Sequence, residues 1–503
     1  MSLAIVHCRA ALGVSAPLVQ IETHLSNGLP AFHLVGLPET AVRESRERVR
    51  SAILNAGFEY PSRRITINLA PADLPKDGTR YDLAIALSVL AASGQIPIPA
   101  LQEIEAVAEL ALSGELRAVA GVLPAAHACR RAGRTLAVAS GNAGEASLVQ
   151  ALSVLGAPTL AALCAHLLGR EALPACACPP TGGDEPAEVP DLAEVRGQLF
   201  ARRALEIAAA GQHNLLLTGP PGTGKTMLAS RLPGLLPVLS DDHAFEVAAV
   251  HSVAGRTRPT THWRVPPFRS PHHTSSAAAL VGGGAVPRPG EASLAHRGIL
   301  FLDELPEFGR HVLDVLREPL ETGSVTVARA ARSVDFPAAF QLVAAMNPCP
   351  CGYHGDLRHP CRCTPEQVAR YHGRVSGPLL DRIDLQVEVA RERDWLESQA
   401  QVEAEPTKAV RSRVFAARRR QLQRQSKPNS ALGVAELGQV ATLAPAEADF
   451  LAQAFRHFNL NPRSYHRILK VARTIADLAG APAIATAHLA EALRLRRLPG
   501  NTR

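Results

Sequence analysis

Residues 215–226 have the sequence LLLTGPPGTGKT. The apolar start of this stretch predicts a buried strand, and residues 227–236 after it are compatible with a helix. Glycines between a strand and a helix let backbone N–H groups surround an anion, and the helix N-terminus adds partial positive charge. The spacing matches that of a phosphate-binding loop in a nucleoside triphosphatase. The stretch therefore predicts an α/β core that binds ATP.

The loop offers a separate group for each part of a bound nucleotide. Lys225 is expected to reach the β- and γ-phosphates, and the Thr226 hydroxyl is expected to bind Mg²⁺. ATP and Mg²⁺ are therefore the predicted cofactors. The residues predicted to cradle the nucleotide are Gly219, Pro220, Pro221, Gly222, Thr223, Gly224, Lys225 and Thr226.

Two further apolar runs end in polar residues. Residues 299–304, ILFLDE, predict a fully buried strand with two carboxylates at its end. Asp303 is expected to hold Mg²⁺ through water, and Glu304 is expected to orient and activate the attacking water. A third strand is predicted at residues 340–346 and ends at Asn347, whose amide could bind the attacking water or the γ-phosphate. Asn before Pro is also a common turn residue, so both interpretations of Asn347 stay open.

A length of 503 residues is too great for one hydrophobic core and predicts two or three domains. Residues 1–170 alternate short β-like runs with helical stretches, as a mixed α/β domain does. Residues 171–190 are rich in Pro, Gly and acidic residues and are interpreted as a linker. Residues 191–398 have the strand and helix alternation of a nucleotide-binding core, and residues 399–503 are predicted to be helical.

The positive charge is concentrated near the C-terminus. The whole chain carries +7, whereas residues 400–503 contain 17 Lys and Arg against 7 Asp and Glu. Aromatic residues make up only 4%, so base stacking is not the expected route to nucleic acid. The start of the sequence has no signal-peptide pattern, and no apolar run is long enough to span a membrane. A cytoplasmic protein without a membrane partner is therefore expected.

Four of the nine cysteines form one tight cluster. Cys349, Cys351, Cys361 and Cys363 follow directly after Asn347 in a CxC-x9-CxC pattern. Four thiolates this close suit a tetrahedral structural zinc site, although zinc pairs usually have wider spacing. Four reduced thiols are the alternative. In either case, the pattern favours a reducing compartment over a disulfide framework.

These motifs and their surroundings resemble the magnesium-chelatase-like AAA+ ATPases, specifically the ComM/YifB family, over nearly the whole chain. The resemblance implies a hexameric ring with ATP at the subunit interfaces and a helical lid at residues 399–503. It implies that Arg382 is an arginine finger supplied to a neighbouring subunit and that Arg463 is a second sensor, with Arg374 and Arg467 as nearby alternatives. The most specific stretches are PFRSPHHT (267–274), VGGG (281–284), PGEASLAH (289–296), LDELPEF (302–308), SGPLLDRID (376–384) and VARTIADL (471–478).

Two segments of the predicted core resemble elements that face the central pore in related motors. Residues 267–296 resemble the helix-two insertion of this clade, and a β-hairpin is predicted from residues 325–329 and 332–336. Paired histidines more often form local hydrogen bonds than substrate contacts. The candidate substrate contacts are Arg269, His272, His273 and Arg329.

The N-terminal domain resembles the proteolytic domain of Lon-type proteases, which has the ribosomal S5 domain 2-like α/β fold. The resemblance rests on PKDG at residues 75–78, GEL at residues 114–116 and the Ala-Gly pair at residues 132–133. Matched by motif, Arg80 stands where the protease has its serine, and Leu123 stands where it has its lysine. Neither residue can perform that chemistry. A catalytically dead interaction or DNA-contacting module is therefore expected.

Residues 408–427 carry eight basic residues and no acidic residue. Val410, Val414 and Ala417 recur at helical spacing and predict a packed stripe with arginines facing outward. These arginines could bind DNA phosphates or could form an ordinary solvated helix surface.

The predicted function is that of an ATP-driven hexameric DNA motor. The resemblance implies a helicase that promotes branch migration of single-stranded or branched DNA during natural transformation, together with recombination proteins. The alternative is a protein-remodelling ATPase of the chelatase type that acts on a protein partner. An ATP-dependent protease is disfavoured by Arg80 and Leu123.

Overall fold

The computed structural model describes residues 2–176, 189–256, 258–259, 262–284, 286–329, 332–356, 359–390, 404–458 and 460–496. The chain forms two compact units: residues 1–183 with 245–263, and residues 184–244 with 264–503. The predicted domain boundaries at 170, 190 and 398 stay predictions. Assignment of residues 245–263 to the first unit is a feature that sequence composition did not indicate.

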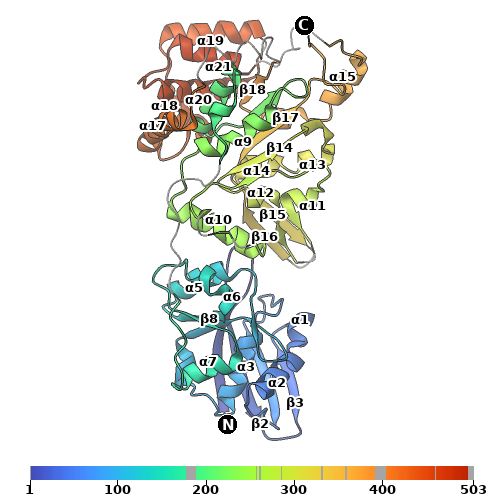
Figure 1. Ribbon diagram of the computed structural model, residues 1–503, viewed down its shortest axis with the longest axis vertical. Coiled ribbons are helices and arrows are strands. Elements are labelled where there is room, and N and C mark those ends of the chain that lie inside the picture. Colours follow the sequence, from blue (N-terminus) through green and yellow to red (C-terminus); the bar gives the residue numbers. More distant parts are fainter. Residues whose placement is uncertain are drawn as a thin grey trace. The chain divides into compact units, whose positions relative to one another are not determined.

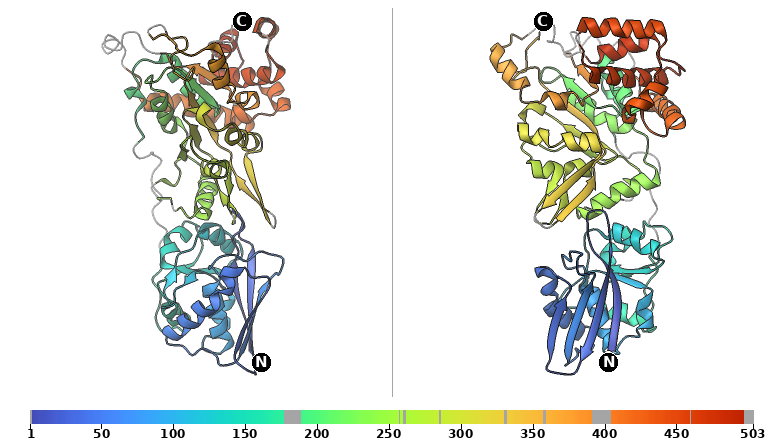
Figure 2. Two further views of the ribbon diagram at one scale, coloured as in Figure 1. Left: turned by 90° about the vertical axis from the view of Figure 1, so that its right-hand side faces the viewer. Right: turned by 180° about the vertical axis from the view of Figure 1, so that it is seen from behind.

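The first unit is built on a mixed seven-stranded sheet with the order β3-β4-β2-β1-β5-β8-β9 (Figures 1 and 2). Residues 65–69 are one of the short β-like runs predicted within residues 1–170, and they lie in β4, whose residues alternate between buried and less buried positions. One face of the sheet packs against α3, which is buried on all sides. The strands are β1 (Ser2–Arg9), β2 (Leu18–Ser26), β3 (Ala31–Val35), β4 (Arg64–Ala70), β5 (Ile104–Val107), β8 (Thr135–Ala139) and β9 (Val154–Ala157).

Helices and one small hairpin complete the first unit. The residues from 245 onward belong to it through contacts far apart in sequence: the ring of Phe245 lies 4.8 Å from that of His127, and Ser252 O accepts a hydrogen bond from Gly121 N. The elements are α1 (Thr40–Arg43), α2 (Ser45–Asn55), α3 (Asp82–Ala92), α4 (Pro99–Gln102), β6 (Glu109–Leu110), β7 (Leu116–Arg117), α5 (Val122–Arg131), α6 (Ser140–Ala146), α7 (Leu160–Leu167) and most of α10 (Asp241–Val253).

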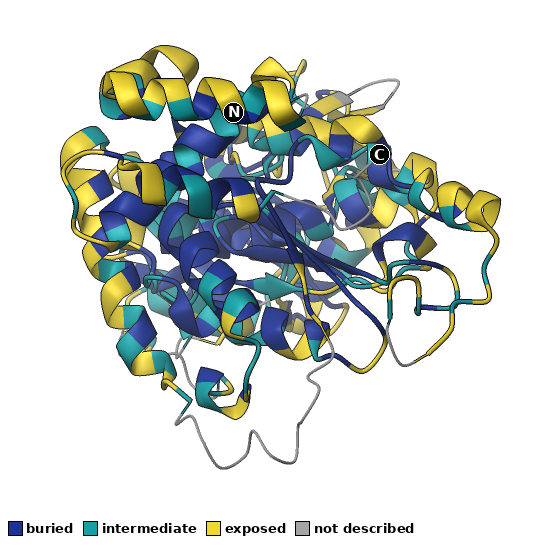
Figure 3. Cartoon of the chain, turned by 90° about the horizontal axis from the view of Figure 1, so that it is seen from above, coloured by how far each residue is buried: buried dark blue, intermediate teal, exposed yellow. Residues whose placement is uncertain are grey.

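The second unit contains a five-stranded sheet with the order β11-β14-β17-β10-β18, and every neighbouring pair is parallel. The three strands predicted around the nucleotide motifs are confirmed as β10, β14 and β17. All their residues are buried, as in a sheet that helices cover on both faces (Figure 3). The strands are β10 (Leu215–Thr218), β11 (Phe268–Arg269), β14 (Ile299–Leu302), β17 (Gln341–Met346) and β18 (Leu385–Glu388).

Further elements of this unit include the predicted hairpin, which is confirmed as β15 (Ser324–Arg329) and β16 (Arg332–Pro337). A second, very short hairpin pairs β12 (Gly282–Gly283) with β13 (Arg288–Pro289). The helices are α8 (Leu199–Gly211), α9 (Lys225–Leu235), α11 (Ala277–Val281), α12 (Glu291–Leu294), α13 (Arg310–Asp314), α14 (Arg317–Thr322), α15 (Pro365–His372) and α16 (Gly377–Leu380).

The described C-terminal part of the second unit is helical between residues 407 and 494, as predicted, and the predicted start at residue 399 lies outside the described residues. The predicted packed stripe is also confirmed, because Val410, Val414 and Ala417 are buried within α17. Over the described residues, no helix combines the length and the hydrophobicity that a bilayer-spanning segment needs. The helices are α17 (Thr407–Gln425), α18 (Val434–Val440), α19 (Pro445–Phe458), α20 (Pro462–Leu478) and α21 (Thr486–Arg494).

Candidate functional site

The carboxyl ends of neighbouring strands bring the predicted nucleotide-binding residues together. β14, β17 and β10 are adjacent and parallel, so the loop after β10 lies near Asn347 and Asp303. Open parallel sheets bind their ligands at this edge. Gly219 begins the loop so close to Val389 that an added Cβ would lie 2.3 Å from the Val389 carbonyl oxygen. The first glycine of the motif is therefore required by the close approach of two backbones.

Lys225 is the first residue of α9, and its buried ammonium group faces the loop. Nζ donates to two loop carbonyl oxygens at 2.7 and 2.8 Å and to Asn347 Oδ1 at 3.1 Å. Burial lowers the pKa of Lys225, against the raising effect of the Asp303 and Glu304 carboxylates. The Asn347 side chain thus points into the loop and is not only part of a turn.

The two carboxylates after β14 have different surroundings. Thr226 Oγ1 donates to Asp303 Oδ2 at 2.6 Å, so both oxygen ligands that Mg²⁺ would need lie side by side. Glu304 has a φ of +52°, which is uncommon for a residue other than glycine. Its side chain is about half exposed, and Oε2 lies 3.2 Å from His273 Nδ1. His273 is therefore a neighbour of the site whose role the sequence motif alone did not indicate.

The other candidate substrate contacts in this region have local partners. Arg269 forms a two-pronged ion pair with Glu291 at 2.6 and 2.8 Å. His272 Nδ1 lies 2.9 Å from the hydroxyl oxygen of Thr274. The side chain of Arg329 lies outside the described residues. The His272 contact agrees with the local hydrogen-bonding alternative stated for the histidines, whereas His273 contacts Glu304.

Arg382 and Arg463 line one cavity of about 1080 Å³ within the second unit. Arg382 is buried and pairs with Glu321, and its pKa is lowered by burial and then by the charges of three nearby arginines. Arg463 is 74% exposed and lies 4.0 Å from Asp381. Among the described residues, neither guanidinium hydrogen bonds with the loop that precedes Lys225. The structure thus groups the predicted finger and the predicted second sensor with each other.

The two alternative arginines are engaged elsewhere. Arg374 forms an ion pair at 2.9 Å with Glu307, which lies in the turn after β14, and both side chains are about half exposed. Arg467 donates to Asp384 Oδ1 at 2.7 Å, and the other Asp384 oxygen lies 3.3 Å from His213 Nδ1. His213 Nε2 lies 2.8 Å from the Thr474 hydroxyl of α20. Asp384, two residues after the predicted finger, is therefore tied to the C-terminal helices through a buried polar network.

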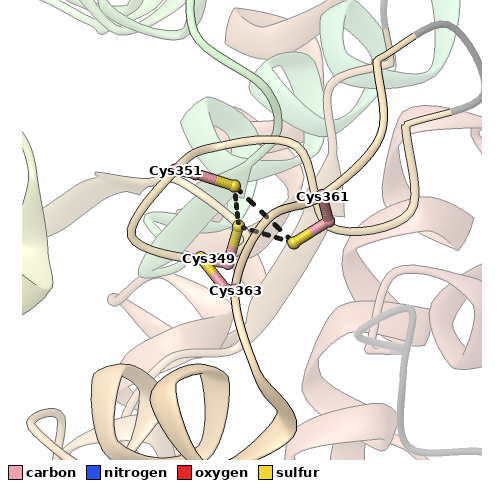
Figure 4. Close-up of side chains that lie close together, drawn as sticks. All are labelled: Cys349, Cys351, Cys361 and Cys363. Atoms are coloured by element: carbon pink, nitrogen blue, oxygen red, sulfur yellow. Dashed lines mark hydrogen bonds between the residues drawn. The ribbon is translucent and has the colours of Figure 1, made fainter.

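The sulfur atoms of the four clustered cysteines all lie within 4.8 Å of one another. Figure 4 shows the four side chains close together. Cys349 Sγ lies 3.3 Å from that of Cys351 and 3.7 Å from that of Cys361, and the last two are 3.6 Å apart. Four sulfurs bound to one zinc at about 2.3 Å would be about 3.8 Å apart, so the donor set fits zinc in identity and in spacing. His354 N also donates to the buried Cys349 sulfur at 3.3 Å.

In the first unit, the two positions that the sequence comparison matched to a protease's catalytic pair hold a cationic and an apolar side chain. Arg80 is buried, and its guanidinium donates to backbone carbonyl oxygens of Arg9, at 3.3 Å, and of Ala120. Burial lowers the pKa of Arg80. Leu123 is buried near the start of α5, just after Ala120. A guanidinium and an aliphatic side chain supply neither a nucleophile nor a base.

Most basic residues of α17 have intramolecular partners. Among the described residues of this helix, the side chains of Lys408 and Arg419 are exposed and form no ion pair or hydrogen bond. The predicted outward basic surface is therefore smaller than the sequence indicated. The engaged residues of the helix are Arg411 (ring of Phe415), Arg413 (with Glu206 and Glu405), Arg418 (Ala209 O), Arg420 (Asp477 O) and Arg424 (Asp477 and Asn429), and Lys427, just after the helix, pairs with Glu436.

Family models match most of the chain. Residues 191–395 match the model described as magnesium chelatase, subunit ChlI, and residues 404–496 match the C-terminal part of that subunit. Residues 21–142 match a model described as subunit ChlI of Mg-chelatase. The fold and these matches define a magnesium-chelatase-like protein of the AAA+ type.

Full-length relatives narrow the assignment. The chain is 51% identical over 498 residues to the uncharacterized protein YifB of Escherichia coli, covering 99% of this chain and 98% of YifB. It is 51% identical over 501 residues to the competence protein ComM of Haemophilus influenzae, with the same coverage of both chains. The magnesium-chelatase 38 kDa subunit of Rhodobacter capsulatus is 27% identical over 348 residues, which are 64% of this chain and 92% of that subunit. The chain therefore belongs to the ComM/YifB family.

Proposed function

We propose that the second unit hydrolyses ATP at the edge formed by β14, β17 and β10. The observation that supports this most is the convergence of four polar groups on one loop: Lys225 with Asn347, and Thr226 with Asp303. Lys225 binds the β- and γ-phosphates, Thr226 and Asp303 hold Mg²⁺, and the exposed Glu304 carboxylate accepts a proton from the attacking water. Bound Mg²⁺ neutralises charge on the phosphate oxygens.

The proposal includes a ring of subunits, predicted to be a hexamer. Arg382 and Arg463 share a cation-rich cavity and do not hydrogen bond with the loop of their own chain among the described residues. Two guanidinium groups so placed suit the phosphates of an ATP held by an adjacent subunit. The ion pair of Arg382 with Glu321 is then the arrangement of a subunit that contacts no neighbouring nucleotide.

We further propose that hydrolysis drives movement on DNA, as a helicase that promotes branch migration during natural transformation. The support is the 51% identity to a protein named competence protein and the excess of basic residues after residue 400. DNA phosphates would be contacted by exposed basic side chains such as Lys408 and Arg419, in a manner weakened by salt. Recombination proteins are the partners that such a motor would need.

A chelatase-type motor that remodels a protein partner is the second candidate. Its support is the similarity to a magnesium-chelatase subunit and the internal pairing of most α17 arginines. The two candidates share the ATP site and differ in what stimulates it.

ATP turnover of the purified chain distinguishes them. Turnover is measured without DNA and with single-stranded, duplex and four-way-junction DNA, each at two salt concentrations. The DNA motor predicts stimulation that is greatest on branched DNA and fades with salt. If none of the DNAs changes ATP turnover, the ATPase proposal is retained and the helicase proposal is rejected. Absence of turnover under all conditions rejects the ATPase itself.

A further inference from the structure

The cysteine loop packs directly against the phosphate-binding loop. Gly352 follows Cys351 and has a φ of +86°, and its backbone N–H donates to Cys349 O at 2.9 Å. A Cβ added at Gly352 would lie 2.6 Å from Cδ of Pro221, in the middle of the phosphate-binding loop. The turn that carries Cys349 and Cys351 therefore also packs against the phosphate-binding loop.

Both ends of the cysteine loop are attached to elements of the site. At the start, Asn347 lies just before Cys349 and contacts Lys225, as described above. At the other end, Cys363 directly precedes the Thr364 cap of α15. The same helix returns to the start of the loop, because His372 Nε2 lies 2.9 Å from the backbone carbonyl oxygen of Pro348.

Between these ends, the described part of the loop has little regular structure of its own. Of the described residues between Asn347 and Thr364, none lies in a helix or strand. Ordering such a segment costs conformational entropy, and a cross-link between its two cysteine pairs offsets that cost. A metal held by four thiolates provides such a cross-link, since metal-binding free energy acts as folding free energy.

We propose that Cys349, Cys351, Cys361 and Cys363 bind zinc and that the zinc-closed loop holds Pro221 and Asn347 in the arrangement that binds ATP. Four thiols lose their protons to solvent as four sulfur–zinc bonds form, and no oxidant or reductant is needed. The zinc has no part in hydrolysis. The second half of the inference rests on the proposed ATP site, whereas the zinc site does not.

Zinc content and nucleotide affinity are measured separately on the full chain. Elemental analysis of the wild type is expected to give about one zinc per chain, and Cys361→Ser is expected to lose most of it. Cys176→Ser is the matched control, because Cys176 is a partly exposed cysteine outside the cluster. Binding of a fluorescent ATP analogue in excess Mg²⁺ is expected to weaken roughly tenfold or more in Cys361→Ser and not in Cys176→Ser. Circular dichroism shows whether each variant is folded.

A glycine pair tests the contact without touching a thiol. Gly352→Ala places a methyl group against Pro221 and is expected to retain zinc while it weakens analogue binding. Gly355→Ala has nearly the same φ, +82°, but its added Cβ has nothing within 4 Å, so it controls for backbone strain. It is expected to bind zinc and the analogue normally. If Gly352→Ala binds the analogue as Gly355→Ala does, contact with Pro221 does not matter for ATP.

Three results would overturn the inference. Less than about half an equivalent of zinc in the wild type rejects the metal site. Equal analogue binding by zinc-loaded and zinc-free wild type, prepared with a zinc-selective chelator, rejects the link to ATP and leaves the proposed function intact. A zinc-loaded wild type that binds no analogue rejects the proposed function and the link together, and the zinc content still stands as evidence for the metal site.

Discussion

His273 Nδ1 lies 3.2 Å from Glu304 Oε2, so a side chain from the segment before β14 contacts the carboxylate proposed to activate water. A carboxylate stabilised by an imidazole at this distance is a poorer base for water. Removing the imidazole frees Glu304. Because exposed ion pairs contribute at most about 1 kcal/mol, His273→Ala is expected to raise basal ATP turnover by no more than about fivefold.

The neighbouring histidine provides the control. The His272 ring lies 4.1 Å from that of His273, but its hydrogen bond goes to Thr274. His272→Ala is therefore expected to leave basal turnover nearly unchanged. Steady-state turnover at saturating ATP checks both variants. A fall in turnover for His273→Ala would mean that His273 positions Glu304 productively and does not restrain it.

Lys225 and Glu304 are expected to separate nucleotide binding from hydrolysis. Lys225→Ala removes the ammonium that faces the loop and is expected to weaken ATP binding. Glu304→Gln removes the base but keeps the shape of the side chain, so the variant is expected to bind ATP and retain it unhydrolysed. Equilibrium binding and single-turnover hydrolysis measure the two steps. Normal hydrolysis by Glu304→Gln would show that another group activates the water.

The elements around the ATP site were predictable because their signals are local. Strands β10, β14 and β17 lie in mainly apolar runs of sequence. The loop needs glycine where two backbones come close, as Gly219 and Val389 do. No local signal specifies a partner that the fold brings from elsewhere. The contact of His273 with Glu304 depends on how the segment between them folds back.

The basic helix shows the same limit for charge. Residues 408–427 contain no acid, so the sequence indicated an outward basic surface. The acids that pair with it come from other helices: Glu206 lies in α8 and Asp477 in α20. Net charge within one segment therefore overestimated its free charge.

Lys408 and Arg419 are expected to carry a measurable part of any DNA affinity. Replacing both with Ala is expected to weaken DNA binding and to reduce the slope of log affinity against log salt by about 0.9 for each duplex phosphate contact that is lost. Titrations at several salt concentrations measure the slope. Arg424→Ala is the comparison, because Arg424 binds Asp477 and its loss is expected to lower stability. An unchanged slope in the double variant would place the DNA contact elsewhere or nowhere.

Arg382 is expected to act on the nucleotide of a neighbouring subunit. Lys225→Ala and Arg382→Ala are each expected to be inactive when alone. In a mixture, an intact Lys225 of one subunit meets an intact Arg382 of the other at some interfaces, so turnover is expected to return. If Arg382 acts on its own chain's nucleotide, no subunit in the mixture has both groups and the mixture stays inactive. ATP turnover of mixed rings decides between the two.

Asp384 is expected to couple stability to pH. Burial alone would raise its pKa, but the hydrogen bond and charge of His213 and the charges of Arg467 and Lys470 outweigh burial and hold the pKa well below its usual range. The unfolded-state pKa of Asp is about 4. The ionised carboxylate therefore stabilises the fold above about pH 4, and this stabilisation is lost progressively as the pH falls below it. Asp384→Asn removes the charge and leaves Arg467 and His213 without it, at a cost of about 3 kcal/mol near neutral pH.

Chemical denaturation of the wild type and Asp384→Asn between pH 7 and pH 3 tests this assignment. Other carboxylates titrate equally in both proteins, so the difference in unfolding free energy isolates Asp384 and is expected to shrink below about pH 4. Asp381→Asn is the matched control, because Asp381 lies 4.0 Å from the exposed Arg463 and is itself only partly buried. Its cost is expected to be within about 0.5 kcal/mol at every pH. If the cost of Asp384→Asn is constant across this range, the buried network does not depend on the Asp384 charge, and shape alone joins the segment after Arg382 to the C-terminal helices.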